Sequence, residues 1–279
     1  MIKNILFAQP IFAPDQMRLE RNINSLQTFG QYLRENGTDS MSLSIIIGGW
    51  AATDELWDKM VDACHKHLNP QLNPVRFDKN YGKAYVLNSL VAHSLQQNPN
   101  INAIISADSD ILFPLETPHM FVRMAIAAEQ IVTIKKQNWG LIGFNQLGQG
   151  CHFKSCWENQ VKYIATVKNQ QFPELIVWPG IASGIAGGCI MINIDLWKSV
   201  GGYVNKSVYG PDDAYMLYLC GQRGFSWQVA DTIGIIHPPE NDQQYAEWKV
   251  KVCQRVAHNP GEDFNSLINE AEGFWKDRK

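Results

Sequence analysis

The first part of the chain alternates short apolar runs with amphipathic helical patterns, and this alternation constrains the fold more than any other feature of the sequence. Near-continuous apolar strands separated by helices are typical of a mainly parallel sheet that is covered on both faces. We therefore predict an α/β fold with a Rossmann-like central sheet. The expected strands are 5–12, 42–47, 75–77 and 103–106, and the expected helices are 18–35, 54–67 and 83–96.

The second part of the chain is more mixed in pattern. It contains an amphipathic segment, a short β-branched run, a Gly/Gln-rich stretch and a glycine-punctuated run before another apolar strand. These are, in order, 118–129, a strand at 131–134, then 140–150, 180–188 and 189–193. Four more helices are expected, at 195–200, 212–223, 245–257 and 262–276. We expect the last two to pack against the core as a lid or brace.

No repeat, low-complexity tract or linker marks a boundary between independent domains, so a single domain is the simpler prediction. The 279 residues include 24 Lys plus Arg against 27 Asp plus Glu, for a net charge of −3. This balance provides no excess of positive charge that would attract a polyanion of any sequence. Nucleic acid is therefore a less expected partner, although it is not excluded.

The cysteines and the apolar runs bear on the compartment. The six cysteines show no CxxC spacing, which fits a reduced, cytoplasmic protein. A zinc site at Cys151, His152 and Cys156 lacks a second closing pair, so plain thiols are favoured. The first apolar run is too short for a signal segment and is broken by Pro10 and Pro14. No run approaches the roughly 20 apolar residues that span a bilayer, so any membrane association should be peripheral.

An acidic triplet follows the apolar strand 103–106. In an open α/β sheet, ligands bind at the carboxyl ends of the strands, so Asp108 and Asp110, with Ser109 between them, are expected at such a crevice. Two aspartates two positions apart can direct oxygen ligands at a divalent cation. The alternative is a turn that merely ends the strand.

Two further features allow a functional and a structural interpretation. Asp212 and Asp213 follow a Gly-Pro turn at a helix start, where a carboxylate is either a cap or a proton acceptor. His237 follows an apolar run and precedes two prolines, and a buried histidine satisfied by a backbone carbonyl is its structural alternative. Their order along the chain, after the acidic triplet and a Gly-Gly pair, favours one shared site.

Taken together, these motifs resemble those of a nucleotide-sugar-dependent glycosyltransferase of the GT-A fold, similar to the family-2 enzymes and the galactosyltransferase C-terminal module. Each motif is weak, but their conjunction over about 160 residues is fairly specific. The matching pieces are NYGK at 80–83 with Asn88, DSD at 108–110, the stretch 187–203, YGPDD at 209–213, and His237.

The resemblance implies a metal-dependent transfer from a nucleoside-diphosphate sugar, with UDP-sugar as the expected donor, to a carbohydrate, glycolipid or other hydroxyl acceptor. It implies a GT-A domain over 1–239, with a nucleotide-binding half at 1–112 and an acceptor half at 113–239, and a helical extension over 240–279. Asp213 would be the base of an inverting single displacement, and Asp212 would orient it or hold acceptor hydroxyls.

The resemblance also distributes the binding roles. Asp110, with Asp108 and His237, would hold Mn2+ or Mg2+. The expected nucleotide-side residues are Gln9, Pro10, Trp50, Asn80, Lys83, Asp108 and Ser109. The expected acceptor-side residues are Tyr209, Trp178, Gly187 and Gly188.

The sequence departs from the family pattern near the nucleotide base. Relatives often end the second strand in an acidic residue, whereas 42–47 is followed by Gly48, Gly49 and Trp50. Trp50 either stacks on the base or belongs to the core, and Asp54 either replaces the missing acid or opens the next helix. Similarly, 180–188 is either a closing loop or a close backbone approach.

Three rival functions remain at this point. A nucleotidyltransferase or phosphatase on the same sheet would be another metal-dependent enzyme, although no Walker-type loop is present. A glycoside hydrolase would use Asp110 and Asp213 as paired carboxylates, but the acidic triplet and the histidine suit a metal better. A non-catalytic nucleotide-sugar-binding module is the third.

Overall fold

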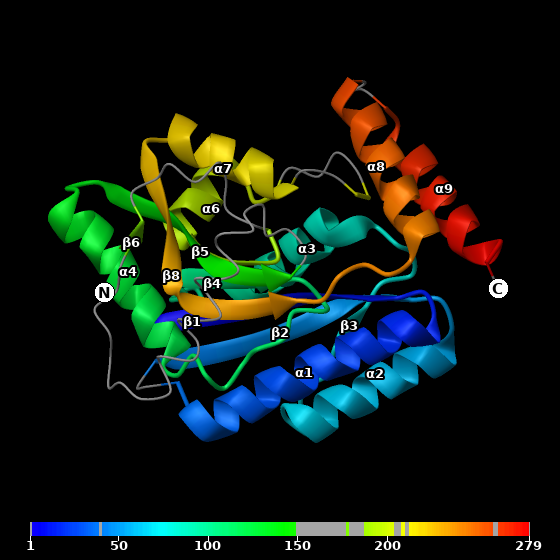
Figure 1. Cartoon of the computed structure of the whole chain (residues 1–279), viewed down its shortest axis with the longest axis horizontal. Helices are drawn as coiled ribbons and strands as arrows, with labels where there is room; N and C mark the ends of the chain where they lie inside the picture. The colour runs from blue at the N-terminus through cyan, green and yellow to red at the C-terminus, as the bar shows by residue number, and fades with distance from the viewer. Residues whose placement is uncertain are drawn as a thin grey trace.

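A computed structural model of the chain describes residues 2–38, 41–148, 177–178, 187–203, 208–209, 212–258 and 262–278. Its described part is built on an eight-stranded sheet in the order β3-β2-β1-β4-β7-β5-β8-β6 (Figure 1). The strands are β1 (Asn4–Ala13), β2 (Ser42–Ala51), β3 (Val75–Arg76), β4 (Ala103–Ala107), β5 (Asn138–Gly148), β6 (Val177–Trp178), β7 (Cys189–Asn193) and β8 (Phe225–His237).

Most strands of the sheet run in one direction. β1 is parallel to β2 and β4, β2 is parallel to β3, and β5 is parallel to β8. β7 is antiparallel to both of its neighbours, β4 and β5, and β6 is antiparallel to β8. The carboxyl ends of β4, β5 and β8 therefore meet the amino end of β7 at the same edge.

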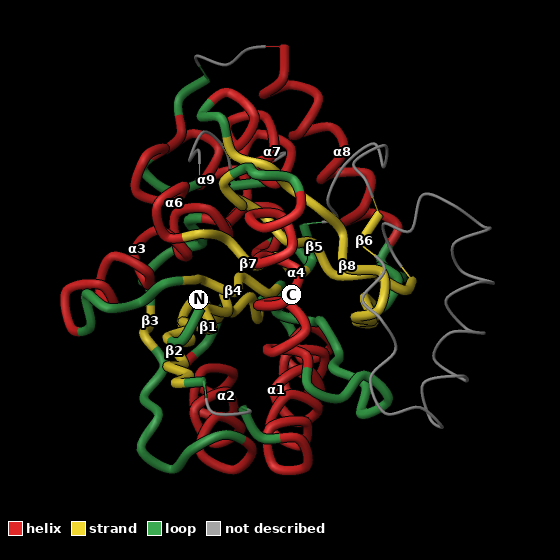
Figure 2. Tube along the Cα trace, turned by 90° about the vertical axis from the view of Figure 1, so that its left-hand side faces the viewer, coloured by secondary structure: helices red, strands yellow, loops and turns green. Residues whose placement is uncertain are grey.

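Helices cover both faces of the sheet (Figure 2). Successive residues of β1 point to opposite faces: Phe7 packs in the cluster that contains α1 and α4 side chains, and Leu6 packs in the cluster of α3, α6 and α7. Both clusters are apolar, which confirms the expected doubly covered α/β fold. The helices are α1 (Gln16–Asn36), α2 (Asp54–His67), α3 (Gly82–Gln97), α4 (Met120–Ile134), α6 (Ile194–Val200), α7 (Asp212–Gln222), α8 (Gln243–His258) and α9 (Phe264–Lys276).

The predicted elements differ from the structure in three places. The strand expected at 131–134 is wrong, because α4 continues through it and buries Ile131 while leaving Ile134 74% exposed. The strand lies instead in the Gly/Gln-rich stretch, as β5, where a Cβ on Gly140 would lie 2.6 Å from Cys220 Sγ. β2 does not end at Ile47 but runs on to Ala51, since Gly48 and Gly49 allow close strand contact.

The predicted C-terminal helices are confirmed as α8 and α9, which form a small apolar cluster of their own with Tyr81 and Tyr209. Arg18 of α1 links this pair to the sheet. Its guanidinium lies 4.4 Å from the Tyr245 ring centroid and 4.5 Å from that of Trp275. No helix in the described ranges is long and apolar enough to cross a membrane.

Candidate functional site

The acidic triplet and His237 meet at the carboxyl edge of the sheet. Asp110 Oδ1 lies 3.3 Å from His237 Nε2, although 127 positions separate the two residues in the sequence. The main chains of Leu112 and Ile236 exchange two hydrogen bonds, of 2.8 and 3.0 Å, directly beside them. This two-bond bridge explains why the turn after β4 lies against the end of β8.

Buried polar groups fix the turn that carries the triplet. Gln9 of β1, which is 1% exposed, donates to the Asp108 carbonyl at 2.9 Å and to the Ser25 hydroxyl at 2.8 Å. The Asp108 amide donates to the Gly188 carbonyl at 2.7 Å. Gln9 thus holds the backbone of this turn in place, and its expected contact with a nucleotide stays a prediction.

The charges around Asp110 and His237 reinforce each other. Burial would raise the pKa of Asp110, but the hydrogen bond and charge of His237, with Arg21 and Lys249, outweigh it and hold that pKa below its usual value. Burial would lower the pKa of His237, but the hydrogen bond and charge of Asp110 raise it instead. On the other side of the ring, Nδ1 lies 2.9 Å from the side-chain amide of Gln146.

A second ionic group lies around Lys83, in the first turn of α3. Its Nζ lies 2.7 Å from Asp108 Oδ1 and 3.5 Å from Asp212 Oδ2, and it donates to the Gly187 carbonyl at 2.9 Å. Burial would lower the pKa of Lys83, but these two carboxylates outweigh it and raise that pKa well above its ordinary value. Lys83 therefore stays charged and joins the β4 turn to the start of α7.

The two aspartates that open α7 have different surroundings. Asp212 is held by Lys83, while burial, the largest effect, raises the pKa of its carboxyl despite that contact. Asp213 packs directly on Gly187 at the amino end of β7, where a Cβ would lie 2.5 Å from Asp213 Oδ2. Glycine at this position is thus required by the close approach of the Asp213 carboxylate.

This contact leads to a prediction for Gly187→Ala. The added methyl group must displace the Asp213 side chain by several tenths of an ångström. With Asp213 in its expected role of base, turnover should fall by roughly 10²-fold. Asp213 Cβ would lie 2.7 Å from the added methyl group, so the first turn of α7 must also move, and we expect a small fall in the melting temperature. The measurement is kcat beside a melting curve. Gly221→Ala, on α7 with nothing near its added methyl, is the matched control and should keep normal turnover.

Two predicted binding residues serve the packing of the extension. Asn80, which is buried, donates to the Tyr209 hydroxyl at 3.3 Å, and its own Oδ1 accepts from the Gly82 amide. The Tyr209 ring lies edge-on to Phe12, Tyr245 and Trp248, at centroid distances of 5.0 to 6.2 Å. Tyr209 is therefore packed against three aromatic side chains while staying only partly buried, and its expected contact with an acceptor stays a prediction.

The remaining predicted residues fall into three groups. Pro10 is buried within β1, and Trp50 is a partly buried residue of β2 whose ring stacks on Phe12 at 6.1 Å. Ser109 lies partly buried between the two acids. Trp178 lies in β6, on the far side of β8 from β5, and its side chain is outside the described residues, as are 179–186 and Cys151 to Cys156.

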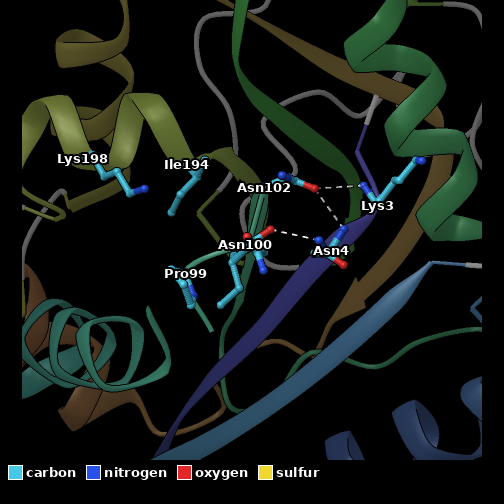
Figure 3. A pocket seen from close by; sticks show the side chains of 8 residues that line it. Lys3, Asn4, Pro99, Asn100, Asn102, Ile194 and Lys198 are labelled. Carbon is cyan, nitrogen blue, oxygen red and sulfur yellow. Dashed lines mark hydrogen bonds between the residues drawn. The ribbon is translucent and has the colours of Figure 1, made fainter. Parts of the chain in front are cut away.

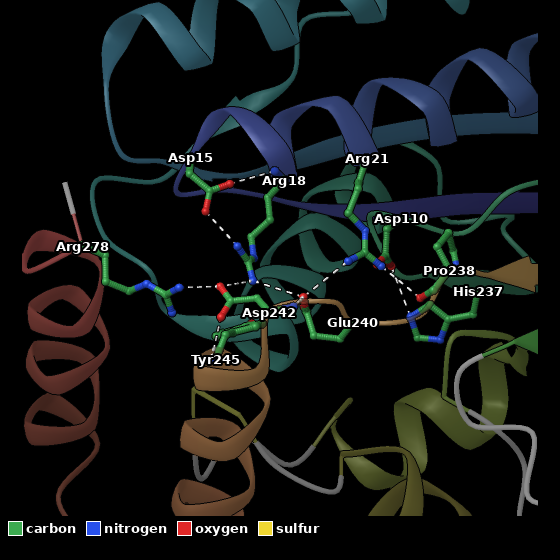
Figure 4. Close-up of polar contacts among 10 residues, drawn as sticks. All are labelled: Asp15, Arg18, Arg21, Asp110, His237, Pro238, Glu240, Asp242, Tyr245 and Arg278. Carbon is green, nitrogen blue, oxygen red and sulfur yellow. Dashed lines mark hydrogen bonds and ion pairs between the residues drawn. The ribbon is translucent and has the colours of Figure 1, made fainter.

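Three residues of the site were missed by the sequence reading. Arg21 of α1 reaches Asp110 Oδ2 at 2.8 Å, and Glu240 lies 3.6 Å from Arg21 (Figure 4). Gln146 of β5 contacts His237. No motif marks Arg21, since it lies on a helix with ordinary amphipathic spacing. A place for Glu240 near the site could have been predicted, because it lies only three residues after His237 in the sequence, before the next helix begins.

The expected three-residue metal site is only partly assembled. Asp110 and His237 lie together, but Asp108 pairs with Lys83. Within the ranges that the structure describes, no group of three or more His, Cys, Asp or Glu could hold an ion. One carboxylate and one imidazole fit an ion whose other ligands come from a diphosphate and water.

A separate hollow lies at the opposite edge of the sheet. It has a volume of about 510 Å³ and is lined by Lys3, Asn4, Pro99, Asn100, Ile101, Asn102, Ile194 and Lys198 (Figure 3). Its asparagines are used internally, as Asn102 accepts from the amides of Lys3 and Asn4. This hollow is at the amino ends of β1 and β4 and contains none of the predicted site residues.

Solved structures share this architecture. Over 99% of this chain, the mannosyltransferase PcManGT from Pyrobaculum calidifontis, in complex with GDP-Man and Mn2+, superposes with a TM-score of 0.58 at 13% identity. GalNAc-T7 with UDP, GalNAc and Mn2+ superposes over 87% of this chain with a TM-score of 0.56 at 11% identity. TarS 1–349 from S. aureus superposes over 85% of this chain with a TM-score of 0.51 at 12% identity. The chain therefore has the GT-A fold.

The likeness is one of fold. The chain spans 70% of the mannosyltransferase, 60% of the TarS fragment and 45% of GalNAc-T7. No protein-family model matches the sequence, and no curated protein matches it.

Proposed function

We propose that the protein is a glycosyltransferase that moves a sugar from a nucleoside-diphosphate sugar, with UDP-sugar as the expected donor, to an acceptor hydroxyl. The observation that carries the proposal is the meeting of Asp110, His237, Lys83 and Asp213 at the carboxyl edge of a GT-A sheet. The GT-A neighbours with GDP-Man, or with UDP and GalNAc, support this substrate class.

The donor side is built from groups that stabilise a leaving diphosphate. A divalent ion held by Asp110 and His237 would act as a Lewis acid on the diphosphate oxygens. Gln146 fixes the orientation of the His237 ring, since it contacts Nδ1 and leaves Nε2 facing Asp110. Lys83, a charged group in the same crevice, would add a second positive charge beside the phosphates.

The acceptor side is built around Asp213. Lys83 holds Asp212, whereas Asp213 lies at the start of β7 against Gly187. A carboxylate there would accept the proton of the acceptor hydroxyl as its oxygen attacks the anomeric carbon. A single attack opposite the leaving group inverts the configuration at that carbon. Asp212 would keep the α7 start in place through Lys83.

The first experiment is a thermal-shift screen of the whole protein with UDP- and GDP-sugars, each with Mn2+ and with EDTA. A donor that binds the folded state raises the melting temperature, and the rise grows with the logarithm of its concentration relative to its Kd. We expect a shift for at least one nucleotide sugar that is larger with Mn2+ than with EDTA. Release of the nucleotide that depends on an added acceptor then shows transfer.

Two outcomes would contradict the proposal. The first is the absence of any shift across the screen, with a folded protein by circular dichroism. The second is cleavage of glycosides in EDTA with no nucleotide sugar present, which would assign the paired carboxylates to hydrolysis. A donor-induced shift without acceptor-dependent release across a broad acceptor panel would favour a binding module.

A further inference from the structure

We propose that Arg21 is a resident cation of the metal site, which opposes the binding of a free divalent ion so that the ion binds tightly only together with a diphosphate. This inference rests on the proposed function for the diphosphate, but its central statement concerns only Arg21, Asp110 and the ion. Arg21 lies one turn after Arg18 on α1, far in the sequence from every predicted site residue except Gln9 and Pro10.

The geometry places the guanidinium directly on the metal-binding carboxylate. Arg21 Nη2 lies 2.8 Å from Asp110 Oδ2 and donates to the Pro238 carbonyl at 2.9 Å, while Nη1 lies 3.6 Å from Glu240 Oε1 (Figure 4). Asp110 therefore uses both oxygens within the chain, since Oδ1 faces His237. The carboxylate is already neutralised before any ion arrives.

The surroundings keep the guanidinium in this position. The Arg21 side chain is 17% exposed, and its Nε is buried without a hydrogen-bond partner among the described residues. The neighbouring turn of α1 is held by Arg18, which pairs with Asp15, Glu240 and Asp242. Because Arg18 already fastens α1 to the segment after β8, the contact of Arg21 with Asp110 is not needed for that purpose.

Charge then decides what the site accepts. A divalent ion bound at Asp110 and His237 would lie within a few ångströms of a fixed positive group in a partly buried setting, where repulsion is weakly screened. A diphosphate adds negative charge that attracts both the ion and the guanidinium. The ion and the diphosphate should therefore bind with positive coupling, each raising the affinity for the other.

The test is calorimetric titration of the full-length, nucleotide-free protein with MnCl2. We compare the wild type with Arg21→Gln and Arg21→Met, which remove the charge, and Arg21→Lys, which keeps it. We expect the two neutral variants to bind Mn2+ at least about tenfold more tightly than the wild type. The lysine variant should stay within about threefold of it.

Arg34→Gln is the matched control, since it removes one positive charge from the same helix at the surface, where Arg34 donates to the His67 carbonyl. Its Mn2+ affinity should equal that of the wild type. Melting curves identify variants that fail to fold. If neither neutral variant folds, the Kd of the nucleotide-free wild type for Mn2+ decides instead. A Kd below about 10 µM overturns the inference, and a higher Kd supports it.

Unchanged or weaker Mn2+ binding in folded Arg21→Gln and Arg21→Met would also overturn it. This outcome is separate from the fate of the proposed function. Suppose that the wild type carries out acceptor-dependent transfer but the neutral variants gain no affinity for Mn2+. The proposed function would then hold, and the proposed role of Arg21 would be wrong. If the neutral variants gain affinity for Mn2+ but the protein binds no nucleotide sugar, the role of Arg21 would hold and the proposed function would be wrong.

Discussion

Asp213→Asn should lower kcat by roughly 10²- to 10⁴-fold, the range that a positioned general base contributes, and leave donor affinity unchanged. The amide has nearly the shape of the carboxylate, so it should fit against Gly187 as the aspartate does. It cannot accept a proton from the acceptor hydroxyl at neutral pH. Turnover should be measured by nucleotide release, and donor affinity by titration with the nucleotide sugar and Mn2+.

Asp110→Asn is the comparison that separates the two sides of the site. This change removes the negative charge that His237 and Arg21 face, so donor affinity in Mn2+ should fall while affinity in EDTA changes less. Asp195→Asn, an exposed residue in the first turn of α6, is the control and should behave as the wild type. Equal losses of donor affinity in Asp213→Asn and Asp110→Asn would refute the division of roles.

The largest expected effect on stability is that of Arg18→Met. Arg18 is 4% exposed and pairs with Asp15 at 2.7 Å, Asp242 at 3.1 Å and Glu240 at 3.3 Å, while its guanidinium lies against two adjoining aromatic rings. Methionine would fill much of the space but leave these carboxylates short of a partner. We expect a loss of about 3 kcal/mol in the free energy of unfolding, measured in urea.

The loss should be concentrated in the C-terminal helices, because Arg18 joins α1 to α8 and α9 through Tyr245 and Trp275. Amide hydrogen exchange should therefore rise in α8 and α9 more than in β1 or β4. Arg76→Gln is the matched control, since Arg76 pairs with the exposed Asp54 at the surface, and it should cost at most about 1 kcal/mol. Similar losses in both variants would contradict the role of Arg18.

The sequence was sufficient for the fold where hydrophobic period and length agreed. α2 begins and ends where its pattern predicts, at Asp54 and His67, because Thr53 caps it and its apolar face packs on β2. The pattern failed at 131–134, where four consecutive β-branched residues look like a strand but continue α4. There, burial of Ile131 within a longer helix outweighed local β propensity.

The site was predictable where a residue ends a strand or opens a helix. Asp110 and His237 were expected to meet, and they do, since Asp110 follows β4 and His237 ends β8, and these two strands end at the same edge of the sheet. Arg21 was not predictable, because its contact with Asp110 depends on the tilt of α1 across the sheet. The packing of Tyr209 against Trp248 was also not predictable, since it depends on where the C-terminal helices lie.

The reversed direction of β7 has a consequence for how such a protein can diversify. The chain leaves the sheet at the end of β5, Gly148, and re-enters at Cys189, and both points lie on the edge that carries Asp110. Apart from the two residues of β6, the intervening sequence adds no strand to the described sheet. Because both points lie on that edge, any sequence grafted between them would begin and end beside Asp110 while the ladder of β1, β4 and β7 keeps its register.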